Sequence, residues 1–305
     1  MFGFILRRLA VAIPTLLLLI VISFVLMHSA PGGPFTQERA LPPQVLANLD
    51  AKYGLDQPLA VQMWTYIVGI LTRFDFGPSF VYPDLSVNDI IAQGFPVTLT
   101  YGAIGFSLSV LFGVILGIIA AIRHNTWIDT LAVGVSIGAQ VLPNFVIAPI
   151  LVLVFTLWLR WLPGGGWGGW PYWVMPIIAL TLSHMASIAR LTRSSMLEVL
   201  GSNHIRTARA KGLSESAVIL RHALKPAMLP VISYLGPLFV TMITGSVVVD
   251  MYFSTGGIGR SFVDSALSRD YAVMMGITIL VGALTIFFNL LVDVLYAWID
   301  PKIRY

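Results

Sequence analysis

The feature that most constrains this sequence is a set of long apolar stretches, each close to the length that a bilayer requires. A helix that crosses a hydrocarbon core of roughly 30 Å needs about 20 mostly apolar residues. Of the 305 residues, 57% are hydrophobic and only 10% are charged, which leaves too few charged side chains to face water on all sides. The sequence therefore predicts an all-α integral membrane protein with six transmembrane helices. They are expected over residues 9–27, 97–122, 130–158, 174–189, 228–249 and 272–292.

The first stretch raises the question of a cleaved secretory signal, because it follows Arg7 and Arg8. Cleavage after Ala30 would place His28 at a position that requires a small residue, with Pro31 just beyond the cut. The apolar run is also long for a signal peptide. We expect this segment to remain as the first membrane span.

Lysine and arginine residues indicate the orientation of the spans. With the amino terminus inside the cell, the inner segments carry most of the positive charges, and the densest basic loop, 190–226, also lies inside. The sequence predicts a first span with a cytoplasmic start over 1–27, an extracytoplasmic loop region over 28–96, and a core of five spans over 97–305. Both termini are then cytoplasmic.

The 28–96 region holds two shorter helical signals. Pro42 and Pro43 are typical of a helix start, and Gly54 is typical of a helix end. The apolar segment from Leu59 to Leu71 is too short to span and contains polar residues. It is expected to lie in the membrane interface or to pack against it.

The inner loop 190–226 contains residues that typically begin and end helices, in an order that predicts a helix, a glycine turn and a second helix. Asn203 is expected to cap a short helix over His204–Lys211, and Gly212 to end it with positive φ. Ser214 is expected to cap the next helix, and Pro226 lacks the N–H that a regular helix ladder needs.

A helix of about eight residues is not stable alone in water, so this one must pack on something. The chain's own spans are expected to offer it little. Ala208 and Ala210 allow a close approach by a partner, and Arg206 and Arg209 share one face of the helix. A short rod joined to two membrane helices suits the transmission of force.

Membrane topology and DNA binding are alternative interpretations of this loop. Positive charge on an inner loop follows from topology or from contact with anionic lipid, which accounts equally well for Arg206, Arg209 and Lys211. The spacing of Ala208, Gly212 and Val218 also imitates a helix-turn-helix, but the adjacent spans leave no room for a third helix. No nucleic-acid partner is therefore expected.

Several segments together resemble one known family. The run from Arg206 to Glu215 resembles the loop that defines the permease subunits of binding-protein-dependent ABC importers, in the form typical of the peptide branch and its B-type subunits. The resemblance covers nearly the whole chain. It extends to Arg7-Arg8, to the large first outer loop, and to the segments 162–167, 221–226 and 300–305.

The resemblance implies a type I importer permease in a bacterial inner membrane, paired with a second homologous permease as a heterodimer. It also implies two cytoplasmic ATPase subunits that hold ATP and magnesium, an extracytoplasmic peptide-binding protein, and a peptide substrate; no cofactor is implied in this chain. The short helix would sit in a cleft of the ATPase. The implied coupling residues are Asn203, Arg206, Thr207, Ala208, Arg209, Ala210, Lys211, Gly212 and Leu213.

The sequence departs from the family pattern at two places. The wider superfamily begins the loop motif with Glu-Ala-Ala, whereas this chain has Arg206-Thr207-Ala208, so an acidic contact does not carry over. The family's outer-loop pattern Phe-x-x-Pro-Gly-x-Gly corresponds to residues 253–259, with Gly256 in place of the proline.

Glycine motifs within the apolar stretches are expected to serve packing. Residues 134–138 match G-x-S-x-G, but they lie inside an apolar helix without the strand-to-helix turn of a catalytic serine. Glycines four apart, Gly134 with Gly138 and Gly113 with Gly117, instead allow a second helix to approach.

Other catalytic and metal motifs are missing from the sequence. It has no cysteine and no G-x-x-x-x-G-K-[ST] phosphate loop, and its five histidines have no metal-binding spacing. His184, alone in a span, is expected to be a hydrogen-bonded packing residue. If transport is driven by ATP, another chain must supply the ATPase.

Polar residues within or at the ends of the spans are candidates for a translocation pathway. A peptide requires a wide and weakly binding passage. Asp250 is expected either to face that passage or to mark the membrane boundary. The candidates are Gln140, Asn144, Asp250 and Asn289, together with Asp293.

The predicted function is that of the permease subunit of an ATP-driven oligopeptide importer, which forms half of the pathway and is itself not an enzyme. A secondary, ion-coupled transporter is the alternative transport mechanism. Such carriers often use buried ionisable relays and inverted repeats, and the sequence shows few such residues and no visible repeat. A membrane-tethered interaction protein without transport is the alternative of a different class.

Overall fold

The computed structural model describes residues 2–29, 35, 42–244 and 246–299. Within them the chain is helical and contains no β-strand. Ala30, after which signal cleavage was considered and not expected, and the terminal motif 300–305 lie outside the described residues. The chain divides into two compact units, described separately. The central unit comprises residues 99–255 and 288–299, and the amino-terminal unit comprises the described residues of 2–98 and 256–287.

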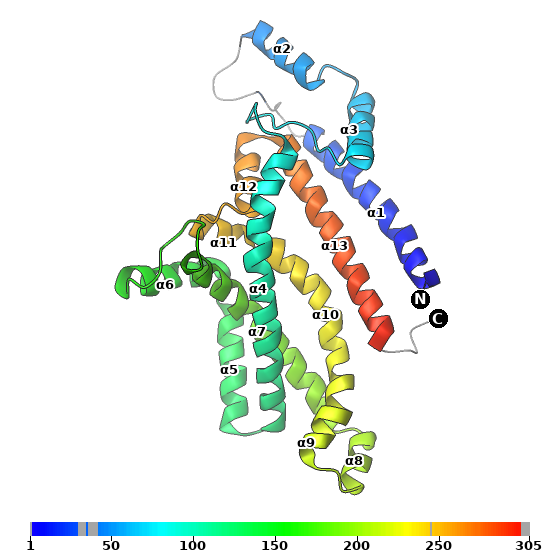
Figure 1. Cartoon of the computed structure of the whole chain (residues 1–305), viewed down its shortest axis with the longest axis vertical. Helices are drawn as coiled ribbons and strands as arrows, with labels where there is room; N and C mark the ends of the chain where they lie inside the picture. Colours follow the sequence, from blue (N-terminus) through cyan, green and yellow to red (C-terminus); the bar gives the residue numbers. More distant parts are fainter. Residues whose placement is uncertain (1, 30–34, 36–41, 245, 300–305) are drawn as a thin grey trace. The chain divides into compact units, whose positions relative to one another are not determined.

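The helices follow one another along the chain as Figure 1 labels them. The first four are α1 (Phe2–Ser29), α2 (Pro43–Tyr53), α3 (Leu59–Arg73) and α4 (Val87–Ile122). The next are α5 (Trp127–Val141), α6 (Asn144–Leu151), the π-helix η1 (Val152–Trp158), α7 (Pro171–Leu200) and α8 (Asn203–Ala210). The last are α9 (Glu215–Ala217), the π-helix η2 (Val218–Ala223), α10 (Leu224–Thr244), α11 (Ser246–Phe253), α12 (Ile258–Ser268) and α13 (Tyr271–Ile299).

Five helical segments are long and apolar enough to cross a membrane, and a broken pair of helices can supply a sixth span. The five lie in α1, α4, α7, the continuous segment Glu215–Phe253, and α13. The six-span prediction is therefore met if the broken pair counts as one span. The predicted division into 1–27, 28–96 and 97–305 stays a prediction.

The span predicted over 130–158 is not one helix. Helix α5 and the following Asn144–Trp158 segment are bent by 98° at a short break (Figure 1). Leu142 takes an extended conformation there, with φ −79° and ψ 110°. The cause is Pro143, which disfavours a helical conformation in the preceding residue and has no N–H to donate.

Two helices run beyond the apolar stretches that predicted them. Helix α4 begins at Val87, ahead of the predicted 97–122. Helix α7 covers Pro171–Leu200 instead of 174–189, because it continues through polar residues that include Arg190 and Arg193. Hydropathy alone marks only the apolar part of such a helix.

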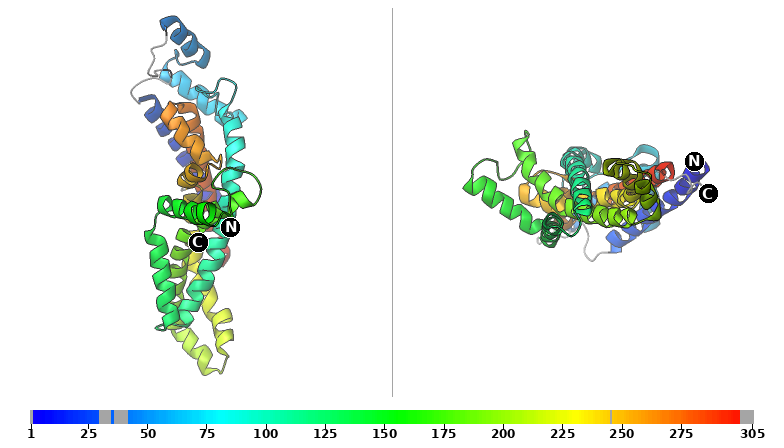
Figure 2. Two further views of the ribbon diagram at one scale, coloured as in Figure 1. Left: turned by 90° about the vertical axis from the view of Figure 1, so that its left-hand side faces the viewer. Right: turned by 90° about the horizontal axis from the view of Figure 1, so that it is seen from below.

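Helix α7 is the element on which the central unit is assembled. It packs along α5 and α10, and these three helices run side by side (Figures 1 and 2). Gly113 and Gly117 of α4 face it closely: a Cβ at Gly117 would lie 2.5 Å from the Ala189 carbonyl oxygen and from Thr192 Cβ. The packing role expected for this glycine pair is confirmed.

The other glycine pair has no such neighbour. A Cβ at Gly134 or Gly138 would meet nothing within 4 Å among the described residues. Among the parts of the chain that the structure describes, therefore, no helix approaches α5 at these glycines. The expectation that they pack against another helix is not met by the chain itself.

The amino-terminal unit holds α1, α2, α3 and the first part of α13. Ile20 of α1, Ile70 of α3 and Ile279 of α13 form its buried cluster. Helix α2 begins at Pro43 and ends before Gly54, which has φ +69°, so both predicted signals are confirmed. Helix α3 packs against α1, and its expected place at the membrane interface stays a prediction.

The glycine contacts of α4 lead to a test with a matched control. Alanine favours a helix over glycine by about 0.5–1 kcal/mol, so Gly138→Ala should leave thermal stability unchanged or slightly higher. Gly117→Ala should lower it, because overpacking costs typically about 1–3 kcal/mol. Thermal unfolding of the purified protein in detergent checks both variants. Equal midpoints for the two would contradict the close α4–α7 contact.

Candidate coupling site

The short helix α8 is anchored by two side chains that face its own chain. Ile205 is fully buried and Ala208 is 6% exposed. They join a cluster in which α4 contributes Ala121, α7 contributes Met196, and η2 contributes Val218 and Ala223. Ala227 of α10 completes this cluster, which we call the α8 seat.

The expectation that the chain's own spans offer α8 little is therefore wrong. The seat is built from η2 and the ends of three long helices, and each of these four segments supplies only one or two apolar residues. No single segment carries an obvious docking surface, which is why the sequence does not show it. Burial of Ile205 supplies roughly 1.5–3 kcal/mol that a helix of this length lacks by itself.

The helix begins one residue earlier than predicted. Ser202, with extended φ and ψ, holds the N-cap position, and Asn203 is the first helical residue. The Ser202 hydroxyl donates to the Val199 carbonyl oxygen at 2.6 Å instead of capping α8. The prediction that Asn203 caps the helix is wrong, because the turn from α7 already brings a second capping-type residue into that position.

The glycine turn after α8 is confirmed. Gly212 has φ +78°, and its N–H donates to the Arg209 carbonyl oxygen at 2.9 Å. A Cβ at Gly212 would meet nothing within 4 Å among the described residues. Glycine is therefore favoured here by backbone conformation and not by crowding.

Beyond the turn, Ser214 holds the predicted N-cap position of α9. The helix then continues through Pro226 with the π-helical segment η2 just ahead of it. A π-helical turn accommodates the hydrogen bond that the proline cannot make, so Pro226 reshapes the helix without ending it.

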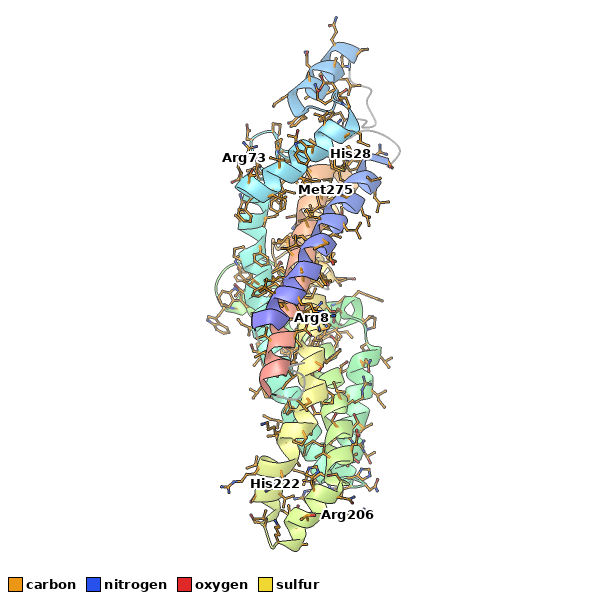
Figure 3. All side chains as sticks on the ribbon, turned by 90° about the vertical axis from the view of Figure 1, so that its right-hand side faces the viewer. Arg8, His28, Arg73, Arg206, His222 and Met275 are labelled. Atoms are coloured by element: carbon orange, nitrogen blue, oxygen red, sulfur yellow. The ribbon has the colours of Figure 1, made fainter. Side chains whose placement is uncertain are left out.

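The two arginines of α8 have different surroundings. Arg209 donates to Glu215 across the turn, with Nε to Oε1 at 2.7 Å and Nη2 to Oε2 at 3.3 Å. The hydrogen bond to this carboxylate raises the pKa of Arg209 above its usual value. Arg206 is exposed, and no salt bridge to another described residue forms at it (Figure 3).

The exposed side of this segment is what remains available to a partner. Opposite Ile205 and Ala208, the segment presents a cationic surface with small or flexible side chains. We call it the α8 outer face; it consists of Arg206, Thr207, Arg209, Ala210, Lys211, Gly212 and Leu213, all exposed.

A partly buried ion pair that sequence reasoning missed joins two helices of the central unit. Asp129 of α5 is 4% exposed and accepts from Arg193 of α7, with Nε to Oδ1 at 2.5 Å and Nη2 to Oδ2 at 2.8 Å. The His124 ring nitrogen and the Asn125 N–H also reach Asp129 Oδ2. The separation of four positions between Asn125 and Asp129 hints at a local turn, but the arginine 64 positions away leaves no signal in the sequence.

The pathway candidates fall into two groups. Gln140 and Asn144 flank the bend between α5 and α6, where Gln140 is exposed and Asn144 accepts from the Ser183 hydroxyl at 3.1 Å. Asn289 is exposed on α13, and Asp293 is half-buried on the same helix. The structure thus brings Gln140 and Asn144 to one place and leaves Asn289 on a separate helix.

The two positions expected for Asp250, on the passage or at the membrane boundary, stay predictions. Asp250 is fully buried in α11 and accepts hydrogen bonds from the hydroxyls of Tyr101, Thr255 and Ser246, the last at 3.3 Å. Three donors from α4, α11 and the following loop converge on one carboxylate. This is the arrangement of a structural hub, since a buried charge needs its hydrogen bonds satisfied.

The glycine that replaces the family's proline has a backbone conformation that proline cannot adopt. Gly256 has φ +76°, whereas the ring of proline fixes φ near −65°. Within the central unit, Phe253 just before it accepts from the Gly166 N–H at 2.6 Å. Within the amino-terminal unit, the N–H of Ile258 donates to Thr98 Oγ1 at 3.0 Å. The loop is therefore fixed by hydrogen bonds on each side of Gly256.

Within the described residues no group of three or more His, Asp or Glu side chains is placed to hold a metal ion. His184 lies half-buried in α7, and its Nδ1 lies 2.7 Å from the Leu180 carbonyl oxygen. This contact is the packing role expected for His184.

Comparison with known proteins covers the whole chain. The family model described as binding-protein-dependent transport system inner membrane component matches residues 113–305, and its N-terminal counterpart matches 1–102. The oligopeptide transport system permease protein OppB of Escherichia coli K12 is 56% identical over 100% of both chains. The dipeptide transport system permease protein DppB of Bacillus subtilis is 43% identical over 95% of this chain and 94% of its own.

A solved structure shows the same fold at low identity. A chain of the MetNI methionine ABC transporter in an inward-facing conformation is 14% identical, with a TM-score of 0.59 over 69% of this chain and 96% of its own. This similarity supports an ABC importer permease fold for most of the chain.

The position of Asp250 leads to a test that separates a structural hub from a pathway residue. Asp250→Ala removes the acceptor of three buried hydroxyls and should lower thermal stability markedly, since each unsatisfied group costs about 1–3 kcal/mol. Asn289→Ala alters an exposed side chain and should change stability by no more than about 0.5 kcal/mol. Thermal unfolding in detergent measures both. Unchanged stability of Asp250→Ala would contradict the hub.

Proposed function

The chain belongs to the family of binding-protein-dependent transport system inner membrane components, and from this premise we propose that it is the permease subunit of an ATP-driven oligopeptide importer. The observation that carries the substrate class is the 56% identity to OppB along the full length of both chains. The second relative, a dipeptide permease, also transports a peptide by its name.

The partners follow from this assignment. A second homologous permease completes the pathway, two cytoplasmic ATPase subunits bind ATP and magnesium, and an extracytoplasmic protein delivers the peptide. This chain is not itself an enzyme and holds no cofactor. The termini and the loop that carries α8 face the cytoplasm, in line with the charge distribution of the sequence.

The geometry of α8 supports a mechanism of coupling. Its inner side is seated on the ends of α4, α7 and α10 through Ile205 and Ala208, and the α8 outer face enters a cleft of the ATPase. Closure of the ATPase dimer on ATP then moves α8, and the buried contacts pass this movement to the membrane helices. Densely packed interfaces shift between discrete arrangements, which suits alternation between inward-open and outward-open states.

The residues of the pathway are proposed from their polar groups, of which Gln140 and Asn289 are exposed and Asn144 is half-buried. Gln140, Asn144 and Asn289 carry neutral polar groups that hydrogen-bond a peptide weakly enough for release. Asp250 is proposed to stabilise the helices around the pathway without touching the peptide, because its three donors already surround it. The Gly134–Gly138 side of α5, open in this chain, is proposed to face the second permease.

The alternative of an ion-coupled transporter is separated by one experiment. Vesicles that contain the complete importer, with ATP inside and no ion gradient, should accumulate peptide. Uptake that persists without ATP and collapses with the ion gradient would overturn the assignment. Purification without bound ATPase subunits would favour a protein that only interacts at the membrane.

Gly212 gives a test of the coupling turn. Gly212→Val should abolish uptake and reduce co-purification of the ATPase, because a β-branched residue is strained at φ +78°. Gly212→Asn is the matched control and should retain most activity, since asparagine tolerates the left-handed region. Equal uptake by the two variants, both normally inserted, would contradict the role of this turn.

Charge reversal at Arg206 tests whether the positive charge of α8 serves ATPase binding or follows only from membrane topology. Arg206→Glu should reduce ATPase co-purification, because it reverses a charge on the α8 outer face. Arg221→Glu is the control, since Arg221 is an exposed cation of the same loop that lies outside α8. If both variants lose the ATPase to the same extent, the positive charge of the loop as a whole, and not α8, is what matters.

A further inference from the structure

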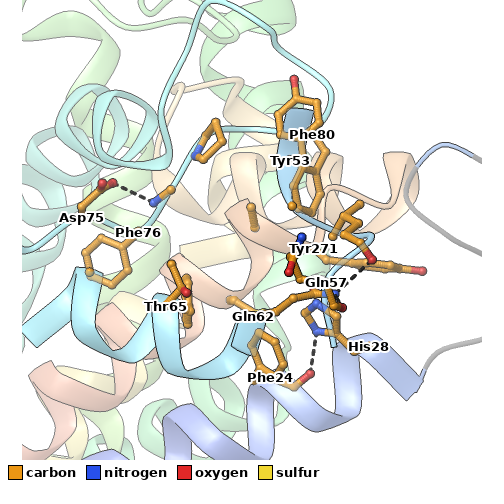
Figure 4. A pocket seen from close by; sticks show the side chains of 18 of the residues that line it. Phe24, His28, Tyr53, Gln57, Gln62, Thr65, Asp75, Phe76, Phe80 and Tyr271 are labelled. Carbon is orange, nitrogen blue, oxygen red and sulfur yellow. Dashed lines mark hydrogen bonds between the residues drawn. The ribbon is translucent and has the colours of Figure 1, made fainter. Parts of the chain in front are cut away.

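A cavity of about 370 Å³ lies within the amino-terminal unit, and the proposed function does not use it (Figure 4). Its wall includes Phe24 near the end of α1, Thr65 of α3, and Met275 of α13. Its size falls in the range of cavities that bind small ligands. The aromatic rings of Tyr53 and Phe80 meet edge to face in the same wall, with centroids 5.2 Å apart.

Three polar side chains in this wall already have partners in the chain, whereas the Tyr66 hydroxyl, buried in the same wall, has none among the described residues. His28 lies with Nδ1 2.9 Å from the Phe24 carbonyl oxygen, and its ring stacks on Phe24. Gln62 donates to the carbonyl oxygens of Leu55 and Gln57 at 3.1 and 2.8 Å. Asp75 accepts from the Gly77 N–H at 2.9 Å (Figure 4). The surface offered to an occupant is therefore mainly apolar, which disfavours a peptide backbone with its many donors and acceptors.

The helices around the cavity present apolar side chains to their surroundings. On α3, Trp64 is 67% exposed and Leu71 is 56% exposed; Phe74, which follows α3, is 75% exposed. Leu26 of α1 is 65% exposed. Helix α1 is a membrane span, and exposed apolar side chains of this size on a membrane protein contact lipid. Lipid contact at these side chains would bring bilayer lipid beside the cavity.

A single cation completes the site. Arg73, at the end of α3, lines the cavity and is exposed, and it lies at the same end of the amino-terminal unit as His28 and Met275 (Figure 3). No salt bridge to another residue of the described ranges forms at Arg73. Its guanidinium can bind a phosphate through two parallel hydrogen bonds.

We infer that this cavity binds one phospholipid, with part of an acyl chain inside it and the phosphate on Arg73. The apolar wall accommodates the chain, and the position beside the bilayer supplies lipid without a path through water. Asp75 is the acidic residue among those that line the cavity, and the bond that its carboxylate accepts from the Gly77 N–H stabilises it without Arg73.

The test uses the complete importer in nanodiscs of phosphatidylethanolamine and phosphatidylglycerol. A small share of the phosphatidylglycerol carries a photoactivatable diazirine in its acyl chain, and mass spectrometry maps the adducts. We expect adducts within 53–80 and 271–275. Thr65→Trp, which narrows the cavity, should reduce them about tenfold, the loss expected when roughly two methylene groups no longer fit. Thr72→Trp, on the same helix but outside the cavity wall, should not.

The phosphate contact has its own variants and its own competition experiment. Arg73→Gln should weaken labelling, and Arg73→Lys should retain more of it. The competition experiment uses the unaltered importer, so it does not depend on the folding of a variant. Unlabelled phosphatidylglycerol should reduce the photolabelling more than a diacylglycerol with the same acyl chains. Equal competition would reject the phosphate contact, and labelling that does not saturate would reject the site.

Loss of the adducts when the peptide-binding protein is added, with cross-links from Thr65 to that protein, would identify a protein occupant and overturn the inference.

Discussion

The burial of Ile205 and Ala208 is the interaction on which the functional account depends. A helix of eight residues has too few internal hydrogen bonds to persist in water, so α8 takes its stability from the ends of α4, α7 and α10. This seat fixes which side of α8 remains open. It also joins the helix to three membrane segments at once, so a force on the α8 outer face reaches all of them without a flexible link.

The same principle holds elsewhere in the central unit. Gly113 and Gly117 let α4 approach α7 closely, the Asp129–Arg193 pair ties α5 to α7, and Asp250 draws the hydroxyls of α4 and α11 together. Helix α7 therefore connects α8 to most of the unit through contacts that tolerate little change in distance. Such contacts favour movement of helices as rigid bodies.

Features that depend on a few neighbouring residues could be predicted from the sequence, whereas contacts between distant segments could not. The apolar stretches, the start of α2 at Pro43 and the positive φ of Gly54 and Gly212 were predictable because each depends on a few neighbouring residues. The seat of α8 was not, because its members come from four separate segments. The hub at Asp250 depends on Tyr101, 149 positions earlier, and the use of Ser202 at the N-cap depends on how α7 turns into α8.

The most direct test measures which side of α8 is open. The chain has no cysteine, so Ala210→Cys and Ala208→Cys each introduce a single thiol, one on the α8 outer face and one in the α8 seat. Maleimide labelling should be fast at position 210 in the isolated permease and strongly protected when the ATPase subunits bind, and slow at position 208 in both cases. Fast labelling at position 208, or labelling at position 210 that is unchanged by the ATPase, would contradict the account.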